Sequence, residues 1–367
     1  MSKEKNQIDL KRLKRLLRHM IDIYSPSGKE EDLLDYLYAY LQRQGLPALR
    51  QRVDDNRYNL IVMPVTAEPQ ILLMGHLDTV AAYEYTHSGF QIKGDVISGL
   101  GAADMKGGCA AMIEAYVAAW QNTSGKLSAA LALVVGEEEN ADGAAKFVEQ
   151  YNIPWVIIGE PTDLQPCLGS YGYLEVQFLS EGRRMHASMA NRGESAVHAL
   201  LLLLTNIISY LEVKRTDVVV NIRDLESMRV GFAAPERCEA WLDIHVPPGI
   251  PLESIVAELD ELSCIATSSQ NALKTTMRFS SIFSGYSLAE TGPLIKTLKK
   301  IYKQHSLAWN PAPFPSHSDA NFLWKSGFRP IILGPGSLEQ AHTPDESISL
   351  SQIISATELY FDLCLYS

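Results

Sequence analysis

In the first part of the chain, some segments have apolar residues at helical spacing and others are apolar runs. This pattern predicts helices and strands in turn. Helical spacing, or an alanine-rich composition, indicates helices over residues 8–24, 27–45, 105–120 and 141–151. Apolar runs indicate strands over residues 59–63, 70–73, 127–135 and 154–158. The last three runs are continuous, as is typical of strands buried on both faces of a sheet. Strands that alternate with helices predict a three-layer α/β domain with a largely parallel sheet.

The pattern changes after about residue 170. Strands are predicted over residues 172–179, 218–225, 238–246 and 274–283, and helices over residues 193–211 and 252–264. In chain order these elements form β-α-β-β-α-β, which is the ferredoxin-like arrangement. Later in the chain, a helix is predicted over residues 293–304 and a short buried strand over residues 330–333, as in the first part of the chain. We therefore predict an α/β domain of residues 1–170 and 284–367, interrupted by an inserted ferredoxin-like (βαββαβ) domain at residues 171–283.

Composition narrows the class of protein. The 367 residues carry a formal net charge of −11, which disfavours sequence-independent binding to nucleic acid. No apolar run approaches the roughly 18–20 residues of a membrane helix, and the polar N-terminus predicts no secretory signal. Five scattered cysteines without a CxxC pair favour a reducing compartment and argue against a disulfide framework or a cysteine zinc site. We expect a cytoplasmic protein with neither nucleic acid nor a membrane as partner.

Histidines and carboxylates gather at the carboxyl ends of the predicted strands. They are His76, Asp78, Asp104, Glu137, Glu138, Glu160 and His342. In open α/β sheets this edge is where ligands bind. Imidazole and carboxylate both suit zinc, and a bridging carboxylate with one His and one carboxylate per ion would hold two ions about 3.5–4 Å apart.

Each of these residues alone has a structural explanation. A single histidine after a strand is more often a hydrogen-bonded structural residue, and residues 137–139 alone would be charges favoured by a helix N-terminus. Gly99 and Gly101 hint at a dinucleotide loop, but Asp104 stands where the third glycine should be, and its charge would repel a pyrophosphate. Only the set as a whole predicts a metal site.

The motifs also resemble a known family. GHLDTV, GLGAADMKGG, VVGEEEN, IIGEPTDLQP and LGPGSLEQAHTPDE follow one another along the chain. In this order they resemble the two-zinc metallopeptidase family of acetylornithine deacetylase, succinyl-diaminopimelate desuccinylase, aminoacylase and the glutamate-releasing carboxypeptidases. The resemblance spans essentially the whole chain, including the insertion, which pairs two subunits in that family. It looks closest to acetylornithine deacetylase.

The resemblance implies a role for each candidate. One zinc ion would be bound by His76 and Glu160, the other by Glu138 and His342, and both by Asp104. Asp78 would orient His76, and Glu137 would be the general base for a hydroxide held between the ions. A histidine of the partner subunit's insertion supplies an oxyanion donor in the family, and His186 matches it, so the active site would be complete only in a homodimer.

The expected function is removal of an acetyl- or succinyl-type group from an amino acid such as ornithine, lysine or diaminopimelate, in amino-acid biosynthesis. Cobalt or manganese would suit the same ligands as zinc. The enzyme alternative is a dipeptidase or carboxypeptidase on the same metal centre, acting on short peptides. The alternative from another class is a non-catalytic binding protein on this scaffold.

Two positions depart from the family pattern for binding a substrate carboxylate. Phe232 stands where relatives carry Asn, and His245 stands where they carry Arg. Imidazole is a weaker and pH-dependent partner for a carboxylate. We therefore hypothesise that an α-carboxylate is not recognised in the relatives' usual way. The alternative is that it is held elsewhere, for instance by Arg183, Arg184 or Arg192. Residues 317–319 resemble a segment that lines the substrate pocket, although Ser318 or Asp319 would equally serve as a helix cap.

Overall fold

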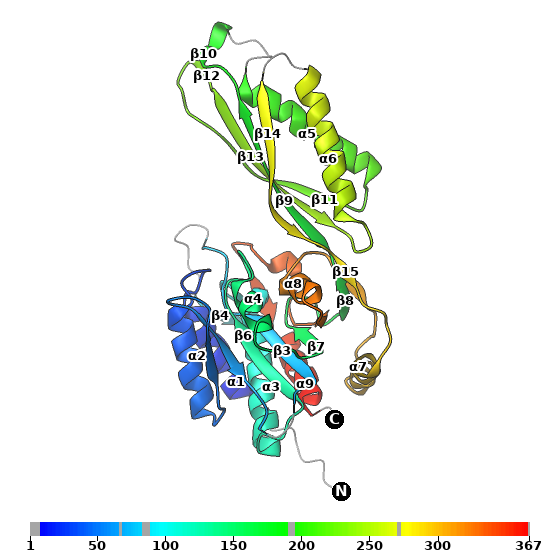
Figure 1. Ribbon diagram of the computed structural model, residues 1–367. Helices are drawn as coiled ribbons and strands as arrows, with labels where there is room; N and C mark the ends of the chain where they lie inside the picture. The colour runs from blue at the N-terminus through cyan, green and yellow to red at the C-terminus, as the bar shows by residue number, and fades with distance from the viewer. Residues whose placement is uncertain (1–7, 66–67, 83–88, 190–194, 270–272, 366–367) are drawn as a thin grey trace. The chain divides into compact units, whose positions relative to one another are not determined.

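The computed structural model describes residues 8–65, 68–82, 89–189, 195–269 and 273–365. The chain forms two compact units (Figure 1). The first comprises Met1–Gly169, Leu288–Phe314 and Ser318–Ser367, and the second comprises Ser170–Ser287 and Pro315–His317. The second unit is thus inserted into the first along the chain.

The first unit is built on a mixed sheet. Its strands are β1 (Leu49–Arg52), β2 (Tyr58–Val62), β3 (Ile71–His76), β6 (Ala129–Val134), β7 (Trp155–Ile158), β8 (Cys167–Ser170), β16 (Ala312–Phe314) and β17 (Arg329–Ile332). They lie in the order β1-β2-β6-β3-β7-β17-β8, with β16 paired to β8. The four central strands β6, β3, β7 and β17 are parallel. Parallel strands that are buried on both faces explain the unbroken apolar runs in the sequence.

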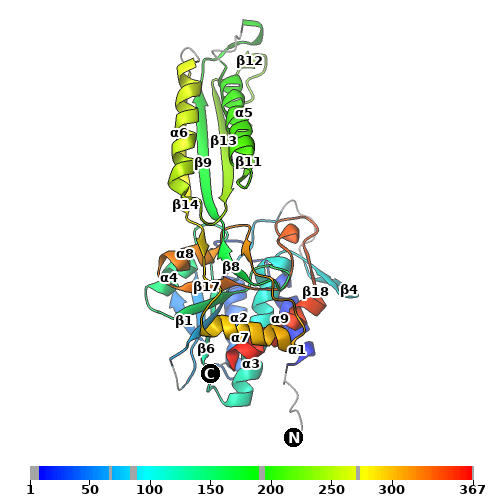
Figure 2. The same ribbon diagram turned by 90° about the vertical axis from the view of Figure 1, so that its right-hand side faces the viewer.

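Helices cover this sheet and complete the core (Figure 2). They are α1 (Leu10–Asp22), α2 (Glu31–Arg43), α3 (Gly107–Thr123), α4 (Asp142–Val148), α7 (Pro293–Gln304), α8 (Asp319–Lys325) and α9 (Leu350–Cys364). A π-helical turn (Ala102–Lys106) precedes α3, and a 3₁₀ turn (Leu338–Gln340) precedes β18. A small sheet is formed by β4 (Gln91–Lys93), β5 (Val96–Ser98) and β18 (Ser347–Ser349). Helix α3 packs against α9, α1 and β3, so the residues that lead into α3 lie beside the central strands.

The second unit has the predicted β-α-β-β-α-β order. Its elements are β9 (Gly172–Glu181), α5 (Ala196–Lys214), β11 (Val219–Ser227), β13 (Arg237–Val246), α6 (Leu252–Ser269) and β14 (Lys274–Phe283). The four strands form an antiparallel sheet in the order β11-β13-β9-β14, the ferredoxin-like topology. Both helices pack on one face, where alternate residues of β9 and β13 are buried. Short elements follow β9, β11 and β14: β10 (Met185–His186) and a 3₁₀ turn (Ala187–Met189) after β9, β12 (Ala233–Ala234) after β11, and β15 (Tyr286–Ser287) after β14.

Residues 27–30 (SGKE) have the sequence of a capping box and predict that Ser27 caps the following helix, which is wrong. The N-cap of α2 is Glu30, and no side chain caps this end of the helix. The Ser27 hydroxyl donates instead to the Asp78 carboxylate, 51 residues away, over 2.7 Å. Glu30 is buried, with its Oε1 lying 3.5 Å from a guanidinium nitrogen of Arg57. Tertiary contacts therefore override the local pattern.

Helix α5 differs from the expectation that no segment is long and apolar enough to form a membrane helix. By length and composition this 19-residue helix, with a mean hydropathy of 1.7, is apolar enough to cross a membrane. One side of α5, including Leu200, Leu203 and Ile207, is buried against the sheet of its own unit. None of the cysteines, all of which lie in the described part of the chain, forms a disulfide.

Candidate metal centre

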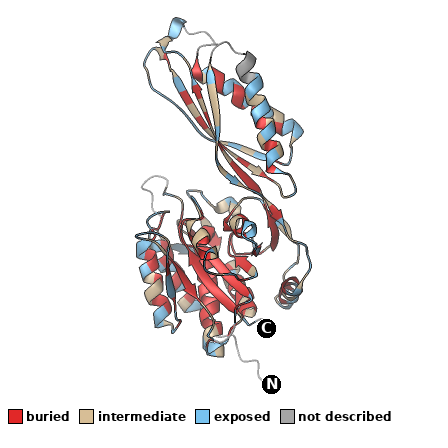
Figure 3. Cartoon of the chain, viewed as in Figure 1, coloured by how far each residue is buried: buried red, intermediate tan, exposed pale blue. Residues whose placement is uncertain are grey.

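The topology of the first sheet brings the predicted residues to one edge. His76 is the last residue of β3, Glu137 and Glu138 follow β6, and Glu160 follows β7. Because β3, β6 and β7 are parallel neighbours, their carboxyl ends meet at the same edge. Asp104 reaches this edge from the π-helical turn that leads into α3. The surrounding strands and helix are largely buried (Figure 3).

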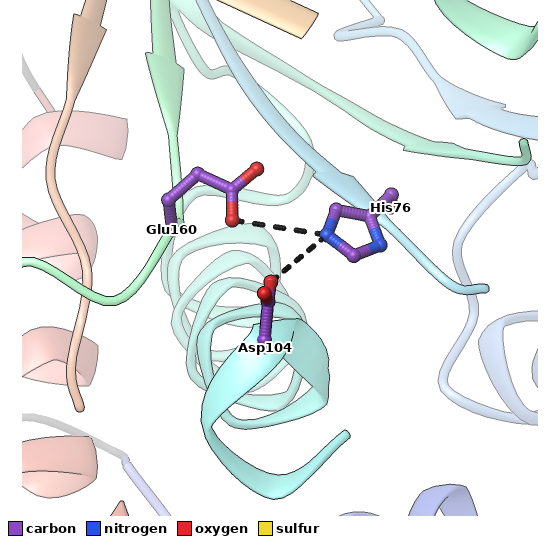
Figure 4. A group of neighbouring side chains, drawn as sticks. All are labelled: His76, Asp104 and Glu160. Atoms are coloured by element: carbon purple, nitrogen blue, oxygen red, sulfur yellow. Dashed lines mark hydrogen bonds and ion pairs between the residues drawn. The ribbon is translucent and has the colours of Figure 1, made fainter. Parts of the chain in front are cut away.

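His76, Asp104 and Glu160 form one compact group of buried side chains. The Nε2 atom of His76 lies 3.2 Å from an Asp104 carboxylate oxygen and 3.7 Å from a Glu160 carboxylate oxygen. Figure 4 shows the two carboxylates converging on this ring nitrogen. Glu137 approaches the same nitrogen to 4.0 Å.

Asp104, Glu138 and His342 form a second group. The Nε2 atom of His342 lies 3.4 Å from Oδ2 of Asp104 and 3.1 Å from a Glu138 carboxylate oxygen. Asp104 thus directs Oδ1 toward His76 and Oδ2 toward His342. A carboxylate between two histidine–carboxylate pairs is the arrangement expected for a bridging ligand.

The electrostatics of both groups fit a cation. Burial raises the pKa of Glu160 to about 8 and raises the pKa of Glu137 well above its usual value. Hydrogen bonds to Asp104 and Glu138 raise the pKa of His342 to about 11. The buried Oε1 of Glu160 has no hydrogen-bond partner among the residues that the structure describes. Buried carboxylates beside imidazoles, with an orphaned oxygen, are a donor set that a divalent ion would satisfy.

The ring of His76 is oriented by Asp78. Its Nδ1 atom donates to the Asp78 backbone carbonyl over 3.0 Å, and the Asp78 carboxylate lies 3.7 Å from the same nitrogen. This contact leaves Nε2 facing the carboxylates without a proton of its own in the neutral ring. The Asp78 carboxylate also accepts the backbone N–H groups of Glu137 and Glu138, over 3.2 and 3.1 Å.

Other predicted residues lie in the second unit and are not part of these two groups. His186 is exposed on β10, where its Nδ1 lies 2.8 Å from the Ser188 hydroxyl. The Phe232 side chain is 89% exposed. His245 lies in an aromatic cluster with Tyr173 and His317, and burial lowers its pKa. Arg183 and Arg184 are exposed, and Arg192 lies outside the described residues.

Within residues 317–319, the contacts support the helix-cap interpretation, and they do so at Ser318. Ser318 is the N-cap of α8 and forms a capping box with Asn321, which confirms the helix-cap interpretation for Ser318. Asp319 is buried, its Oδ1 has no hydrogen-bond partner in the described part of the chain, and burial raises its pKa to about 7.

Two residues that contact the site were not among those predicted. Ser27 hydrogen-bonds the Asp78 carboxylate, and Glu346 hydrogen-bonds the backbone around Asp104. Glu346 follows His342 within the same motif, and this position is the only signal that the sequence offered for it.

Comparisons with known proteins identify relatives of this chain. Residues 72–366 match the model of peptidase family M20/M25/M40. The chain is 29% identical to the acetylornithine deacetylase of Edwardsiella ictaluri, over 91% of this chain and 90% of that protein. A tripeptidase from Staphylococcus aureus has the same fold, with a TM-score of 0.80 at 19% identity, covering 97% of this chain and 98% of that one.

A second solved structure with the same fold is that of a metal-binding protein. YxeP of Bacillus subtilis, a dinuclear metal-binding peptidase of the M20 family, shares the fold with a TM-score of 0.69 at 12% identity, covering 97% of each chain. Fold, motifs and sequence similarity lead to one conclusion. The chain belongs to peptidase family M20/M25/M40 and is a hydrolase that acts on amide bonds.

Proposed function

We propose that this enzyme is a two-metal N-acyl amino acid deacylase. Its substrates would carry an acetyl- or succinyl-type group on ornithine, lysine, diaminopimelate or a similar amino acid. The observation that carries the proposal is Asp104, whose two carboxylate oxygens face separate histidine–carboxylate pairs. The similarity to acetylornithine deacetylase over most of both chains supports an acyl amino acid as substrate.

Each proposed ion has its own ligands. His76 and Glu160 would hold one ion, Glu138 and His342 the other, and Asp104 would contact both. Zinc is the expected metal, and cobalt or manganese suits the same donor atoms. Two such ions would activate a water molecule and polarise the amide carbonyl.

Glu137 is the proposed general base. It belongs to neither ligand group, yet its side chain lies beside them, 4.0 Å from Nε2 of His76, and is only 12% exposed. Its backbone N–H donates a hydrogen bond to the Asp78 carboxylate, which fixes the main chain from which the Glu137 side chain extends. From this position the Glu137 carboxylate would take a proton from the attacking water and return it to the leaving amine.

The proposal includes a cytoplasmic homodimer in which the partner subunit's His186 donates a hydrogen bond to the oxyanion. Its support is the exposure of His186 on β10 and of an apolar surface on the second unit. Leu201 and Leu202 of α5 and Val219 and Leu225 of β11 are exposed, and β11 is an edge strand. A second copy that covers this surface would form a two-fold interface.

A substrate panel tests the proposal. Zinc-loaded protein is assayed against N-acetyl and N-succinyl amino acids and against dipeptides and longer peptides with free termini. Faster cleavage of acyl amino acids supports a deacylase, whereas faster cleavage of peptides would replace it with a dipeptidase or carboxypeptidase.

Glu137→Gln separates catalysis from binding, with its exposed neighbour Glu139 as the matched control. The expected result is a loss of about 10²–10⁴-fold in kcat with both ions retained, because only proton transfer is removed. Glu139→Gln should keep wild-type activity. A wild-type protein that binds two ions but hydrolyses nothing in the panel would indicate a non-catalytic binding protein.

A further inference from the structure

Glu346 makes an unusual set of contacts beside the candidate metal centre. Its side chain is 5% exposed and accepts three backbone N–H groups from one short loop. Oε2 accepts from Gly101 over 2.7 Å, and Oε1 accepts from Ala103 over 2.8 Å and from Asp104 over 3.0 Å. Hydrogen bonds from amides to a carboxylate are about twice as strong as neutral ones.

The loop that carries these amides is tightly enclosed. Gly101 has a φ of +75°, and a side chain there would meet Thr79 and Lys106. Ala103 is fully buried and Asp104 nearly so. Without the Glu346 carboxylate, the buried N–H groups of Ala103 and Asp104 would each lose their partner. The loop would then have to move or admit water.

Any such movement would change the position of Asp104. Its backbone N–H is one of the three donors, and its side chain directs one oxygen toward each ligand group. A carboxylate that bridges two ions needs both oxygens in place, so a small shift of its backbone affects both ions.

Glu346 also connects Asp104 with the segment that carries His342. The Glu346 backbone N–H donates to the Thr343 carbonyl over 3.2 Å, and its carbonyl accepts from the Gly99 N–H over 3.2 Å. The next residues, Ser347–Ser349, form β18, which pairs with β5 just before the loop. Two ligands of the second group, Asp104 and His342, are therefore linked through Glu346.

We propose that Glu346 is a positioning residue that holds the backbone of Asp104 so that its carboxylate can bridge two divalent ions. The inference rests on the proposed two-metal function. Glu346 itself is not proposed to contact substrate or metal. Its role is to fix the bridging ligand through the backbone.

The test compares Glu346→Gln with a control on a second buried carboxylate. Glu114 on α3 is fully buried, accepts from Arg12 and from the Asp9 backbone, and lies outside both ligand groups. Glu114→Gln therefore also changes a buried, hydrogen-bonded carboxylate in the same unit. Apo proteins are titrated with Zn²⁺ by calorimetry and with Co²⁺ by absorption, and thermal unfolding of the apo forms is recorded.

The expected result is a loss of about 10–100-fold in affinity for at least one ion in Glu346→Gln, with a changed Co²⁺ spectrum. A glutamine has only one acceptor oxygen, and its amide group would face a backbone donor. Glu114→Gln should lower the unfolding temperature but keep wild-type affinity and spectrum. Glu346→Asp, which keeps the charge but is shorter, serves as the second variant if Glu346→Gln does not fold.

Two outcomes would overturn the proposal. In one, the folded variant binds both ions with wild-type affinity and spectrum, whatever its unfolding temperature. In the other, neither Glu346 variant folds while Glu114→Gln does, because Glu346 would then serve the fold itself. A wild-type protein that fails to bind two ions would instead contradict the proposed function.

Discussion

The carboxylate of Asp78 accepts a hydrogen bond from the backbone N–H of Glu137 over 3.2 Å. A second bond, from the backbone N–H of Glu138, reaches the same carboxylate over 3.1 Å. Asp78 therefore fixes the main chain from which the proposed general base and one proposed ligand extend. It also orients His76 through its own backbone carbonyl. One residue thus links the ends of β3 and β6.

Replacing Asp78 by Asn should lower kcat by about 10–100-fold, the usual effect of losing a partner of a metal ligand. An amide presents one acceptor where the carboxylate presents two, so one of the Glu137 and Glu138 N–H groups is left unsatisfied. Steady-state kinetics and metal analysis of the folded variant measure the effect. Ser27→Ala, which removes only the hydroxyl donor to Asp78, should cause a smaller loss. Wild-type kcat and metal content in the Asn variant would contradict this role for Asp78.

Regular elements could be predicted where the sequence pattern is strong. The helix predicted over residues 293–304 and the strand predicted over residues 274–283 have the bounds of α7 and β14. Helix α7 has a buried apolar side and an exposed polar one, with Pro293 at its first position. Helix α9, in contrast, was not predicted. Most of its surface is buried, including Thr357 and Tyr360, so it has no wide polar face to reveal a helical period.

The candidate site could be predicted because the strand order of an α/β sheet places strand ends together. His76 is the last residue of β3, and Glu138 and Glu160 follow its parallel neighbours, which is enough to bring them to one edge. The roles of Ser27 and Glu346 could not be predicted. Glu346 contacts the Gly101 N–H, which lies 245 residues earlier, and any residue there would offer the same backbone donor. Contacts to a backbone donor therefore cannot be predicted from the pattern of side chains along the sequence.

Loss of the Arg12–Glu114 ion pair should destabilise the fold. Arg12 makes two hydrogen bonds of 2.7 Å to the fully buried Glu114 carboxylate. Arg12→Met leaves that carboxylate buried without its cation, which should lower the free energy of unfolding by about 3–5 kcal/mol at neutral pH. Denaturant unfolding followed by tryptophan fluorescence measures the change. The surface pair Lys146–Glu149 is the control, since Lys146→Met should change stability by less than about 1 kcal/mol.

The destabilisation by Arg12→Met should depend on pH. Burial already raises the pKa of Glu114, and removing Arg12 takes away an interaction that lowers it. A carboxyl group whose folded pKa lies above its unfolded pKa stabilises the fold below the unfolded pKa and loses this effect as pH rises through the folded pKa. The variant should therefore lose more stability at about pH 7.5 than at about pH 5. An equal loss at both pH values would show that Glu114 stays ionised without Arg12.

Substrate selection should depend little on an α-carboxylate. Burial lowers the pKa of His245, so its imidazole is neutral near pH 7, and no described residue forms a hydrogen bond with its Nδ1. A hydrogen bond between a charged pair contributes about 1.5–3 kcal/mol, which corresponds to roughly a 10–100-fold change in kcat/KM. Without such a pair, an N-acyl amino acid and its α-amide should be cleaved with kcat/KM values within about 10-fold of each other.

His245→Ala and Arg184→Ala distinguish the sources of any carboxylate preference. A strong preference that His245→Ala leaves unchanged would refute the hypothesis. If Arg184→Ala then abolishes the preference, the exposed arginine holds the carboxylate instead. Arg183→Ala tests the neighbouring exposed arginine, the other described candidate, in the same way.

Mixed dimers test whether an active site takes residues from both subunits. Glu137→Gln and His186→Ala homodimers should each have low activity, the first for lack of the base and the second for lack of the oxyanion donor. After mixing and subunit exchange, about half of the dimers are heterodimers, and each has one site with both residues intact if the partner subunit's His186 serves the site. Activity should therefore rise to about a quarter of the wild-type value, since one of two sites works in about half of the dimers.

The same mixture separates this arrangement from a site within one subunit. If Glu137 and His186 served the same site from one chain, each chain of a heterodimer would lack one of them, and mixing would restore nothing. Leu202→Glu places a charge on the exposed apolar side of α5 and should give monomers by light scattering. A monomeric Leu202→Glu variant with wild-type kcat would contradict the shared site, since no partner subunit would then be present to supply His186.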